Sequence, residues 1–246
     1  MSYIKTPNLP QKKVKSAIIA NLDSKITDFV KSFGMELLFT DKNCFIDPAI
    51  SYHADVNCFY LGSGKIIADN SQSKLIEALK QKNLSIISPS KPVSGAYPND
   101  CRLNCASVKS KLIAKYASVD PKILKEYSKD NVLSVRQGYA KCSSAIVNDN
   151  AIITDDPSIF SVCVNNGFDS LLISKGCVCL PGHDYGFIGG ACGLIEKNKM
   201  IFFGDITKHK DYFKIAGFLK KHNCELFYLS GHALTDIGGI IAIEEE

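Results

Sequence analysis

The sequence predicts an α/β fold in which five similar units are arranged as a ring. The first observation is an internal repeat: a Gly-His pair is followed at the same spacing by Ile-Gly-Gly, once from Gly182 and again from Gly231. The second is that one order of elements, a helix, a strand, a loop and a hairpin, recurs along the chain. The third is that the last hairpin lacks its second strand, for which the N-terminal region offers a candidate. Recurrence of this kind indicates a repeat architecture.

Length and composition are those of an ordinary globular protein. The 246 residues are 46% apolar and 22% charged, and a chain of this length can bury a sizeable core. No low-complexity segment or shift in composition marks a boundary. We therefore expect one domain over residues 1–246, with residues 1–15 as a polar N-terminal arm.

The distribution of charge and the lengths of the apolar runs limit the classes of partner that the chain could bind. The net charge is +4 with lysines spread along the chain, so we expect no nucleic-acid partner. No apolar run has the length of a membrane span and the N-terminus lacks a signal-peptide core, so we expect no membrane partner and a cytoplasmic location. The ten cysteines are expected to be reduced, and none belongs to a paired CxxC array, so no metal or cofactor is predicted. The oligomeric state is left open.

The first two units can be followed from the apolar run at 16–20. The polar Asn-Leu-Asp-Ser that comes next is typical of a helix start, and Gly34 of a helix end. A strand at 35–40 and a loop with Pro48 precede a hairpin at 53–69, which turns at Gly62-Ser63-Gly64. The second unit repeats the order with a helix at 73–83, a strand at 84–88, a loop rich in Pro and Gly, and a hairpin at 101–115.

The remaining units have the same order. Asp120-Pro121 opens the third helix, because proline is tolerated in a first helical turn. The predicted elements are then a strand at 132–135, a hairpin at 139–155, a helix at 157–167, a strand at 170–174, the glycine-rich hairpin at 182–205, a helix at 211–223, a strand at 224–230 and the shortened hairpin at 231–243.

The missing strand of the fifth hairpin is expected to come from the other end of the chain. SAIIANLDSK, from Ser16, resembles GKIIADNSQSK, from Gly64, where a second hairpin strand runs into its helix. We therefore predict that residues 16–20 pair with the last strand around 238–243 and close the ring. Closure would remove exposed sheet edges, which otherwise promote aggregation.

Five such units around a pseudo-fivefold axis resemble the penteins, the α/β-propeller fold of the guanidino-group modifying enzymes. The resemblance covers residues 16–243 and depends on the order of elements more than on motifs. That superfamily includes arginine and agmatine deiminases, dimethylarginine dimethylaminohydrolase and amidinotransferases, and also non-catalytic relatives such as a ribosome anti-association factor. The chain looks most like an uncharacterised bacterial branch with this fold.

The catalytic residues that the resemblance implies are not in their expected places. Enzymes of the superfamily carry a nucleophilic cysteine in the last unit, assisted by a histidine and a carboxylate from the middle of the chain. Here no cysteine follows Cys224, and the third unit offers Lys141 and Cys142 but no histidine. We therefore expect no deiminase activity on free arginine or agmatine by the family mechanism.

Cysteines nevertheless recur at similar places in the hairpins. Alignment of the hairpins puts Cys58, Cys105, Cys142 and Cys192 in one column, with Ile241 in the fifth place. One interpretation is that small thiols pack well where five strands converge. The other is a thiol-lined ligand or soft-metal site, with Cys142 and Cys192 as candidate relocated nucleophiles.

A second group of candidates is polar and lies where each loop enters its hairpin. In a ring these side chains would meet at one mouth and suit a small polar or cationic ligand; the alternative is that they only form turns and cap strands. The group consists of His53, Asp55, Asn57, Asp100, Asn104, Lys141, His183, Asp184, His232 and Asp236.

The first unit allows a finer prediction. If residues 53–58 form a strand, alternation puts His53, Asp55 and Asn57 on one face and Cys58 on the other. We predict that Asp55 and Asn57 point to the mouth and that Cys58 packs beneath the helices. Three functions stay open: binding of a small polar or cationic ligand without catalysis, a guanidino-compound hydrolase or transferase with a relocated cysteine, and a protein-binding ring without a pocket.

Overall fold

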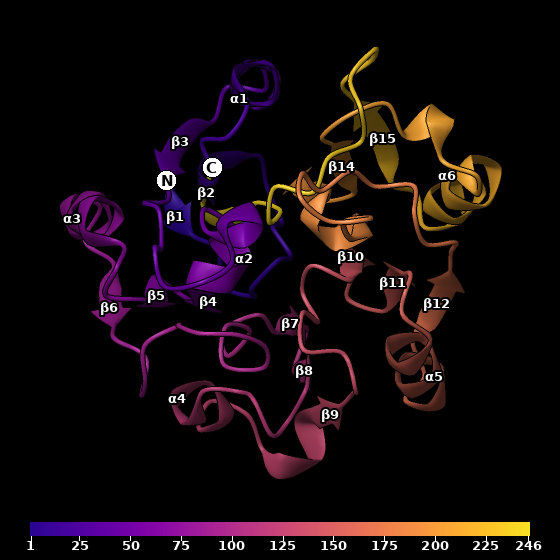
Figure 1. The fold of residues 1–246 in the computed structure, drawn as a ribbon. Helices are drawn as coiled ribbons and strands as arrows, with labels where there is room; N and C mark the ends of the chain where they lie inside the picture. Colours follow the sequence, from indigo (N-terminus) through magenta and orange to yellow (C-terminus); the bar gives the residue numbers. More distant parts are fainter.

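The computed structural model describes all 246 residues and has five small β-sheets around a common centre, with helices on the outside (Figure 1). Four sheets have three strands each, in the order in which they occur along the chain. These strands are β4 (Cys58–Gly62), β5 (Lys65–Ala68) and β6 (Ser85–Ile87); β7 (Ala106–Val108), β8 (Lys111–Ala114) and β9 (Val132–Ser134); β10 (Ser144–Asn148), β11 (Ala151–Thr154) and β12 (Asp169–Leu172); and β13 (Cys192–Glu196), β14 (Lys199–Phe202) and β15 (Glu225–Tyr228).

Each of these sheets is built in the same way. The first two strands form an antiparallel hairpin, and the third pairs in parallel with the second after a helical crossover. The helices between second and third strands are α3 (Ser73–Gln81), α4 (Pro121–Leu124), α5 (Pro157–Asn165) and α6 (Tyr212–Lys221), and α1 (Ser24–Lys31) takes the same place in the fifth sheet. The sheet-forming unit is therefore a hairpin followed by a helix and a strand, which is the predicted order in a shifted frame.

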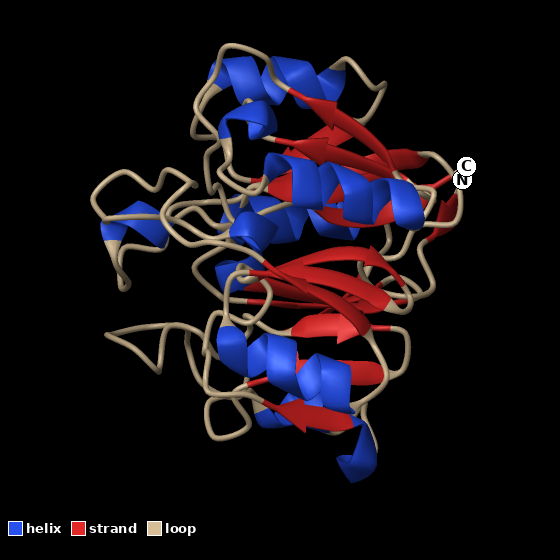
Figure 2. Cartoon of the chain, turned by 90° about the vertical axis from the view of Figure 1, so that its right-hand side faces the viewer, coloured by secondary structure: helices blue, strands red, loops and turns tan.

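The fifth sheet combines the two ends of the chain. Its order is β1 (Ser2–Tyr3), β16 (Ile241–Glu245), β2 (Val14–Ile19) and β3 (Glu36–Phe39). Strand β2 pairs antiparallel with β16, with Ile18 opposite Ile241, and in parallel with β3. The predicted pairing of residues 16–20 with the last strand is thus present, and the two termini lie side by side (Figure 2).

The second strand of each hairpin is apolar on both faces because it is covered on both. Ile66 packs in one core cluster and its neighbour Ile67 in another. Leu112 and Ile113 likewise belong to two different core clusters, as do Met200 and Ile201. Buried strands of this kind appear in a sequence as continuous apolar runs.

Helix starts follow the capping residues expected from the sequence. Asp23 accepts hydrogen bonds from the backbone N–H groups of Lys25 and Ile26 at the start of α1. Asp120 and Asp156 do the same before α4 and α5, each with proline in the first turn. These carboxylates satisfy donors that a helix N-terminus leaves unpaired. No helix is long and apolar enough to span a bilayer.

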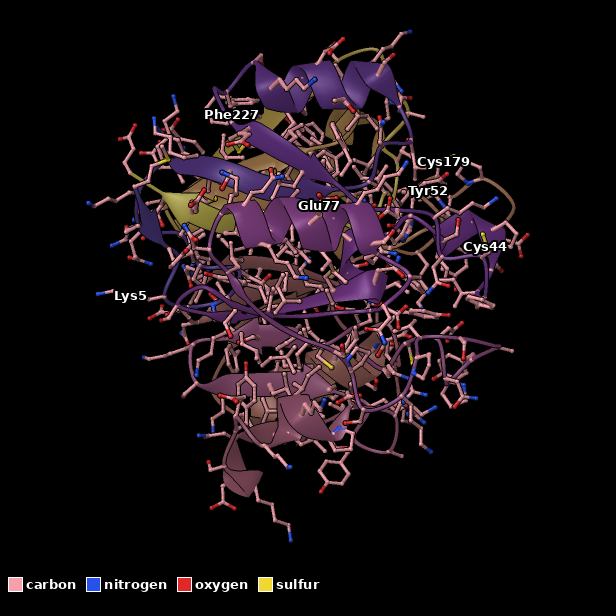
Figure 3. All side chains as sticks on the ribbon, turned by 90° about the vertical axis from the view of Figure 1, so that its left-hand side faces the viewer. Lys5, Cys44, Tyr52, Glu77, Cys179 and Phe227 are labelled. Carbon is pink, nitrogen blue, oxygen red and sulfur yellow. The ribbon has the colours of Figure 1, made fainter.

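The segment predicted as an arm is packed against the sheets. Ile4 is fully buried, its N–H donates to the carbonyl of Ile243, and its carbonyl accepts from Ser63 in the β4–β5 turn. Leu9 is buried in the core cluster that also holds Ala106. The segment therefore lies at the end of the molecule where the hairpins turn. Figure 3 shows Lys5 on that side and Tyr52, Cys44 and Cys179 on the opposite side.

Candidate functional site

A cavity of about 700 Å³ lies at the end of the molecule where loops enter the hairpins. Its walls come from loops within 45–53, 95–100, 139–142 and 180–187 and from Asp236, so all five units contribute. Of the polar side chains predicted to meet there, His53, Asp100, His183, Asp184 and Asp236 line the cavity, and Cys142 joins them.

The other predicted residues lie elsewhere. Asp55, Asn57, Asn104 and Lys141 are buried and do not line this cavity. His232 lies outside it, where its Nε2 is 2.9 Å from Asp23 Oδ2 at the start of α1. The two Gly-His pairs of the repeat therefore have different surroundings.

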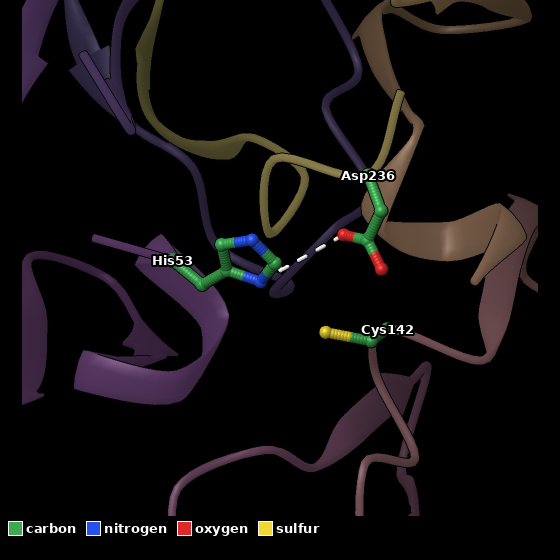
Figure 4. Close-up of side chains that lie close together, drawn as sticks. All are labelled: His53, Cys142 and Asp236. Carbon is green, nitrogen blue, oxygen red and sulfur yellow. Dashed lines mark ion pairs between the residues drawn. The ribbon is translucent and has the colours of Figure 1, made fainter. Parts of the chain in front are cut away.

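Three buried side chains, from the loops that precede strands of three different sheets, meet at the floor of the cavity. His53 precedes β4, Cys142 precedes β10 and Asp236 precedes β16 (Figure 4). Their ligand atoms all lie within 4.8 Å of one another, and His53 Nδ1 is 3.7 Å from Asp236 Oδ1. Nitrogen, sulfur and oxygen donors at this spacing could hold a divalent transition metal, and they also suit thiol chemistry.

The sequence predicted a strand from residue 53, but the structure has none there. Residues Ala54–Asn57 form one helical turn, α2, and the predicted alternation of Asp55 and Cys58 is therefore wrong. The Asn57 amide donates to the carbonyls of Ser51 and His53 and fixes this turn. Asn57 is a support for the loop, and Asp55 lies beneath Cys142 instead of pointing to the mouth.

Cys142 is held by polar contacts from two neighbouring units. Its S–H donates to Asp55 Oδ2 at 2.8 Å, and its sulfur accepts from Asn104 Nδ2 at 3.2 Å. Asn104 Oδ1 also accepts from the backbone N–H groups of Lys141 and Cys142. Asn104 therefore orients the cysteine, and the Lys141 ammonium donates to the carbonyl of Gly189 at 3.2 Å.

The predicted cysteine column does not include Cys142. Cys58 and Cys192 begin their strands, but β10 begins at Ser144, two residues after Cys142, because residues 139–144 form a turn. Cys58, Cys105 and Cys192 are buried in the apolar core. Cys192 does not line the cavity and packs in the same core cluster as Ile188 and Phe202, so Cys192 is a packing residue.

The glycines of the repeat make room for the site. Gly238 has φ of +77°, and a side chain there would overlap His53. A side chain at Gly186 or Gly190 would overlap Asp236. The Asp236 carboxylate accepts from the N–H groups of Phe187 at 2.9 Å and Gly238 at 3.0 Å, so backbone donors hold it beside the histidine.

Burial sets the protonation of the floor. It raises the pKa of Asp55 to about 7, against the opposing charge of Lys141, and it raises the pKa of Cys142 well above that of a free thiol, with the Asp55 charge adding to the effect. It lowers the pKa of His53, although Asp236 opposes this. The free site thus contains a neutral imidazole and a protonated thiol at neutral pH.

Several polar atoms of the floor have no partner. Both ring nitrogens of His53 and Oδ1 of Asp55 are buried without a hydrogen bond. Buried polar atoms are normally paired, and an unpaired one costs about 1–3 kcal/mol. The nitrogens of His53, which lines the cavity, therefore mark the place where a bound group would make contacts.

One wall of the cavity is aromatic, which was not predicted from the sequence. The ring centroids of Tyr97 and Tyr139 are 5.8 Å apart, those of Tyr139 and Phe187 6.3 Å, and those of Phe187 and Tyr185 6.1 Å. The Tyr139 hydroxyl donates to Asp100 at 2.6 Å. An aromatic residue stands shortly before the hairpin in units two to four, and this recurrence could have indicated the wall.

The chain belongs to a family of unknown function (DUF6873), which it matches over residues 17–241. No curated protein matches the sequence. Solved structures with a similar fold include SxtG, an amidinotransferase from Microseira wollei in the saxitoxin biosynthetic pathway, with TM-score 0.61 and 9% identity over 99% of this chain and 97% of that one. The inosamine-phosphate amidinotransferase StrB1 from Streptomyces griseus has a TM-score of 0.60 and 9% identity, over 100% of this chain and 97% of that one. The C. jejuni agmatine deiminase has a TM-score of 0.54 and 11% identity, over 92% of this chain and 91% of that one.

These similarities confirm the predicted pentein fold. At such low identity they concern the fold alone. Cys142 stands in the third unit, where the resemblance led us to expect a histidine, and Asp236 stands in the last unit, where it led us to expect the cysteine.

Proposed function

We propose that the chain is a cysteine-dependent hydrolase or transferase that acts on a small guanidino-like cation bound in the cavity, with Cys142 as the nucleophile. The observation that carries this proposal is the setting of Cys142: its thiol lines the cavity and donates to Asp55 at 2.8 Å, with His53 and Asp236 beside it. A nucleophile with an adjacent base is the usual arrangement for covalent catalysis.

A cationic substrate is supported by the charges of the walls. Asp47, Asp100, Asp184 and Asp236 line the cavity, and aromatic rings lie beside them. Carboxylates and ring faces both attract cations. A bound cation would also favour the ionised forms of Asp55 and Cys142, because an opposite charge nearby lowers the pKa of an acid. Substrate binding would thus promote the thiolate that the empty site disfavours.

The proposed step can be written with its atoms and electrons. The Cys142 sulfur attacks the guanidinium carbon while its proton passes to Asp55, and the C=N π pair moves to nitrogen. A nitrogen lone pair then re-forms the C=N bond as the carbon–nitrogen bond to the leaving amine breaks. The amine leaves with that bonding pair and takes the proton from Asp55, so that a positively charged amidino group remains on sulfur. The amidino group stays on sulfur until water (hydrolysis) or a second amine (transfer) displaces it. His53 is placed to take a proton from the displacing molecule, because its ring nitrogens are free.

The cavity also supports a simpler function, in which the chain binds the cation without chemical change. The third alternative from the sequence, a protein-binding ring without a pocket, has no support from a cavity of about 700 Å³.

The experiment compares the native chain with Cys142→Ser and with Cys44→Ser as a matched control, since Cys44 is an exposed thiol. Each protein is screened against a panel of guanidines for binding, for release of ammonia or amine, and for a covalent adduct by intact mass. We expect turnover and an adduct in the native and Cys44→Ser proteins only. Turnover that survives Cys142→Ser would reject Cys142 as nucleophile, and binding without turnover in the native chain would favour the simpler function.

A further inference from the structure

We infer that the substrate is an organic cation with an apolar body and no carboxylate group. The inference rests on the proposed function in one respect, that this cavity is the substrate site. Two features of the cavity carry it: the lack of lysine and arginine among its lining residues and the extent of its apolar surface.

The first feature concerns charge. The 17 lining residues include four aspartates and two histidines but no lysine or arginine. A substrate with an α-carboxylate, such as an amino acid, would bring an anion among carboxylates without a cationic partner. Burial of an unpaired charge of this kind strongly disfavours binding.

Two lysines lie beside the aromatic wall. Lys115 Nζ lies 4.3 Å from the Tyr97 ring centroid and donates to its hydroxyl, and Lys175 Nζ lies 6.0 Å from the Tyr185 ring centroid. Neither lysine lines the cavity. His183 pairs with Asp47 at 3.0 Å, and burial lowers the pKa of His53, so neither imidazole offers a free positive charge.

The second feature concerns size and polarity. Ten of the 17 lining residues are hydrophobic, and the linked rings of Tyr97, Tyr139, Phe187 and Tyr185 form one wall. Phe45 extends the apolar surface at the mouth, where its side chain is 71% exposed. A cavity of about 700 Å³ is of the size that holds a drug-sized ligand. An aryl or long alkyl group on the cation would cover these rings.

The test uses two matched pairs of probes, each differing by one carboxylate: agmatine against arginine, and phenethylguanidine against N-amidinophenylalanine. Dissociation constants are measured by calorimetry. We expect the carboxylate-free member to bind at least tenfold more tightly in both pairs, and phenethylguanidine to bind more tightly than agmatine. Equal or tighter binding of arginine than of agmatine would overturn the inference and leave the role of Cys142 untouched. If none of the four probes binds, both the inference and the proposed site are wrong.

Two variants strengthen the test. Asp184→Lys places the missing cation at an exposed position of the wall and should reverse the preference within each pair, whereas Asp130→Lys, an exposed change away from the cavity, should leave it as it is. Tyr97→Ala removes one ring of the wall and should weaken phenethylguanidine binding severalfold more than agmatine binding. An unchanged preference in Asp184→Lys, or equal losses for the two probes in Tyr97→Ala, would contradict the inference.

Discussion

Cys142 donates its S–H to Asp55 at 2.8 Å across 87 residues of sequence, which joins the third unit of the fold to the first. Neither residue alone would indicate chemistry, since one is a buried thiol and the other a buried acid. Together they form a donor and an acceptor whose proton can move when charge at the site changes. This contact is the reason to regard the floor of the cavity as reactive.

The first prediction removes the acceptor. Asp55→Asn keeps the shape of the side chain but cannot take the thiol proton, so we expect turnover to fall about 10²–10⁴-fold, the usual contribution of a general base. The fold should be retained, because burial already opposes the charge of Asp55. Steady-state rates and thermal unfolding of the variant give both results. A rate within threefold of the native rate would contradict the role of Asp55 as general base. Asp130→Asn, a change at the surface, is the control.

The second prediction concerns the glycines that make room for Asp236. Gly190→Ala would place a methyl group against the Asp236 carboxylate, and we expect it to destabilise the fold by about 1–3 kcal/mol and to abolish ligand binding. The control is Gly217→Ala in α6, where a side chain meets nothing within 4 Å. That change should stabilise the protein by about 0.5–1 kcal/mol, because alanine favours helix. Urea unfolding of both variants provides the comparison, and similar effects of the two would show that Asp236 does not need the space.

The third prediction concerns pH. Burial raises the pKa of Asp155 to about 7, against the opposing charge of Lys175 and with added repulsion from Asp156 and Asp236. The folded protein therefore holds this proton more tightly than the unfolded chain, whose ordinary pKa is 3.8. Stability from this group is complete below the ordinary pKa and is lost as pH rises to about 7, by up to about 1.4 kcal/mol per pH unit.

Asp155→Asn should flatten this dependence and raise the melting temperature at pH 7.5 relative to the native chain. Asp55 changes in the same direction, so part of the slope should remain in the variant. Melting temperatures measured between pH 4.5 and 8 give the comparison. Identical slopes for native and variant proteins would show that Asp155 is ionised throughout.

Much of the fold could be predicted from the sequence because it depends on local signals. Apolar second strands, the caps at Asp23 and Asp120 and the likeness of residues 16–25 to residues 64–74 are all visible in the chain. The polar group at the loop-to-hairpin transitions was likewise found by its recurrence. Such signals are read correctly where neighbouring residues determine the backbone.

The wrong predictions concern segments whose backbone conformation is determined by residues distant in the sequence. His-Ala-Asp-Val-Asn alternates like a strand, but Asp55 N–H donates to the carbonyl of Gly238, and the chain makes one helical turn under the last unit instead. Cys142 was aligned as a strand residue, but it lies in a turn. That turn is held by Asn104 of the preceding unit, so the residues around Cys142 do not reveal it. His232 was grouped with His183 because of the repeat, but Asp23 at the start of α1 attracts it away from the cavity.

The last prediction concerns the N-terminal strand. Strand β2 lies between β16 and β3, and Val14, Ile18 and Ile19 are fully buried. Deletion of residues 1–20 would expose the inner edges of both neighbouring strands and remove these side chains, each of which contributes roughly 1.5–3 kcal/mol. That sum is comparable with the whole stability of a typical domain, so the deletion should prevent folding. Deletion of residues 1–3 removes only the short edge strand β1 and the hydrogen bond from Tyr3 to the carbonyl of Lys82, and should lower the melting temperature by a few degrees. Circular dichroism with temperature distinguishes the two deletion variants, and addition of a peptide of residues 1–20 to the longer deletion should restore a cooperative transition. A cooperative transition at the native temperature without that peptide would show that β2 is dispensable.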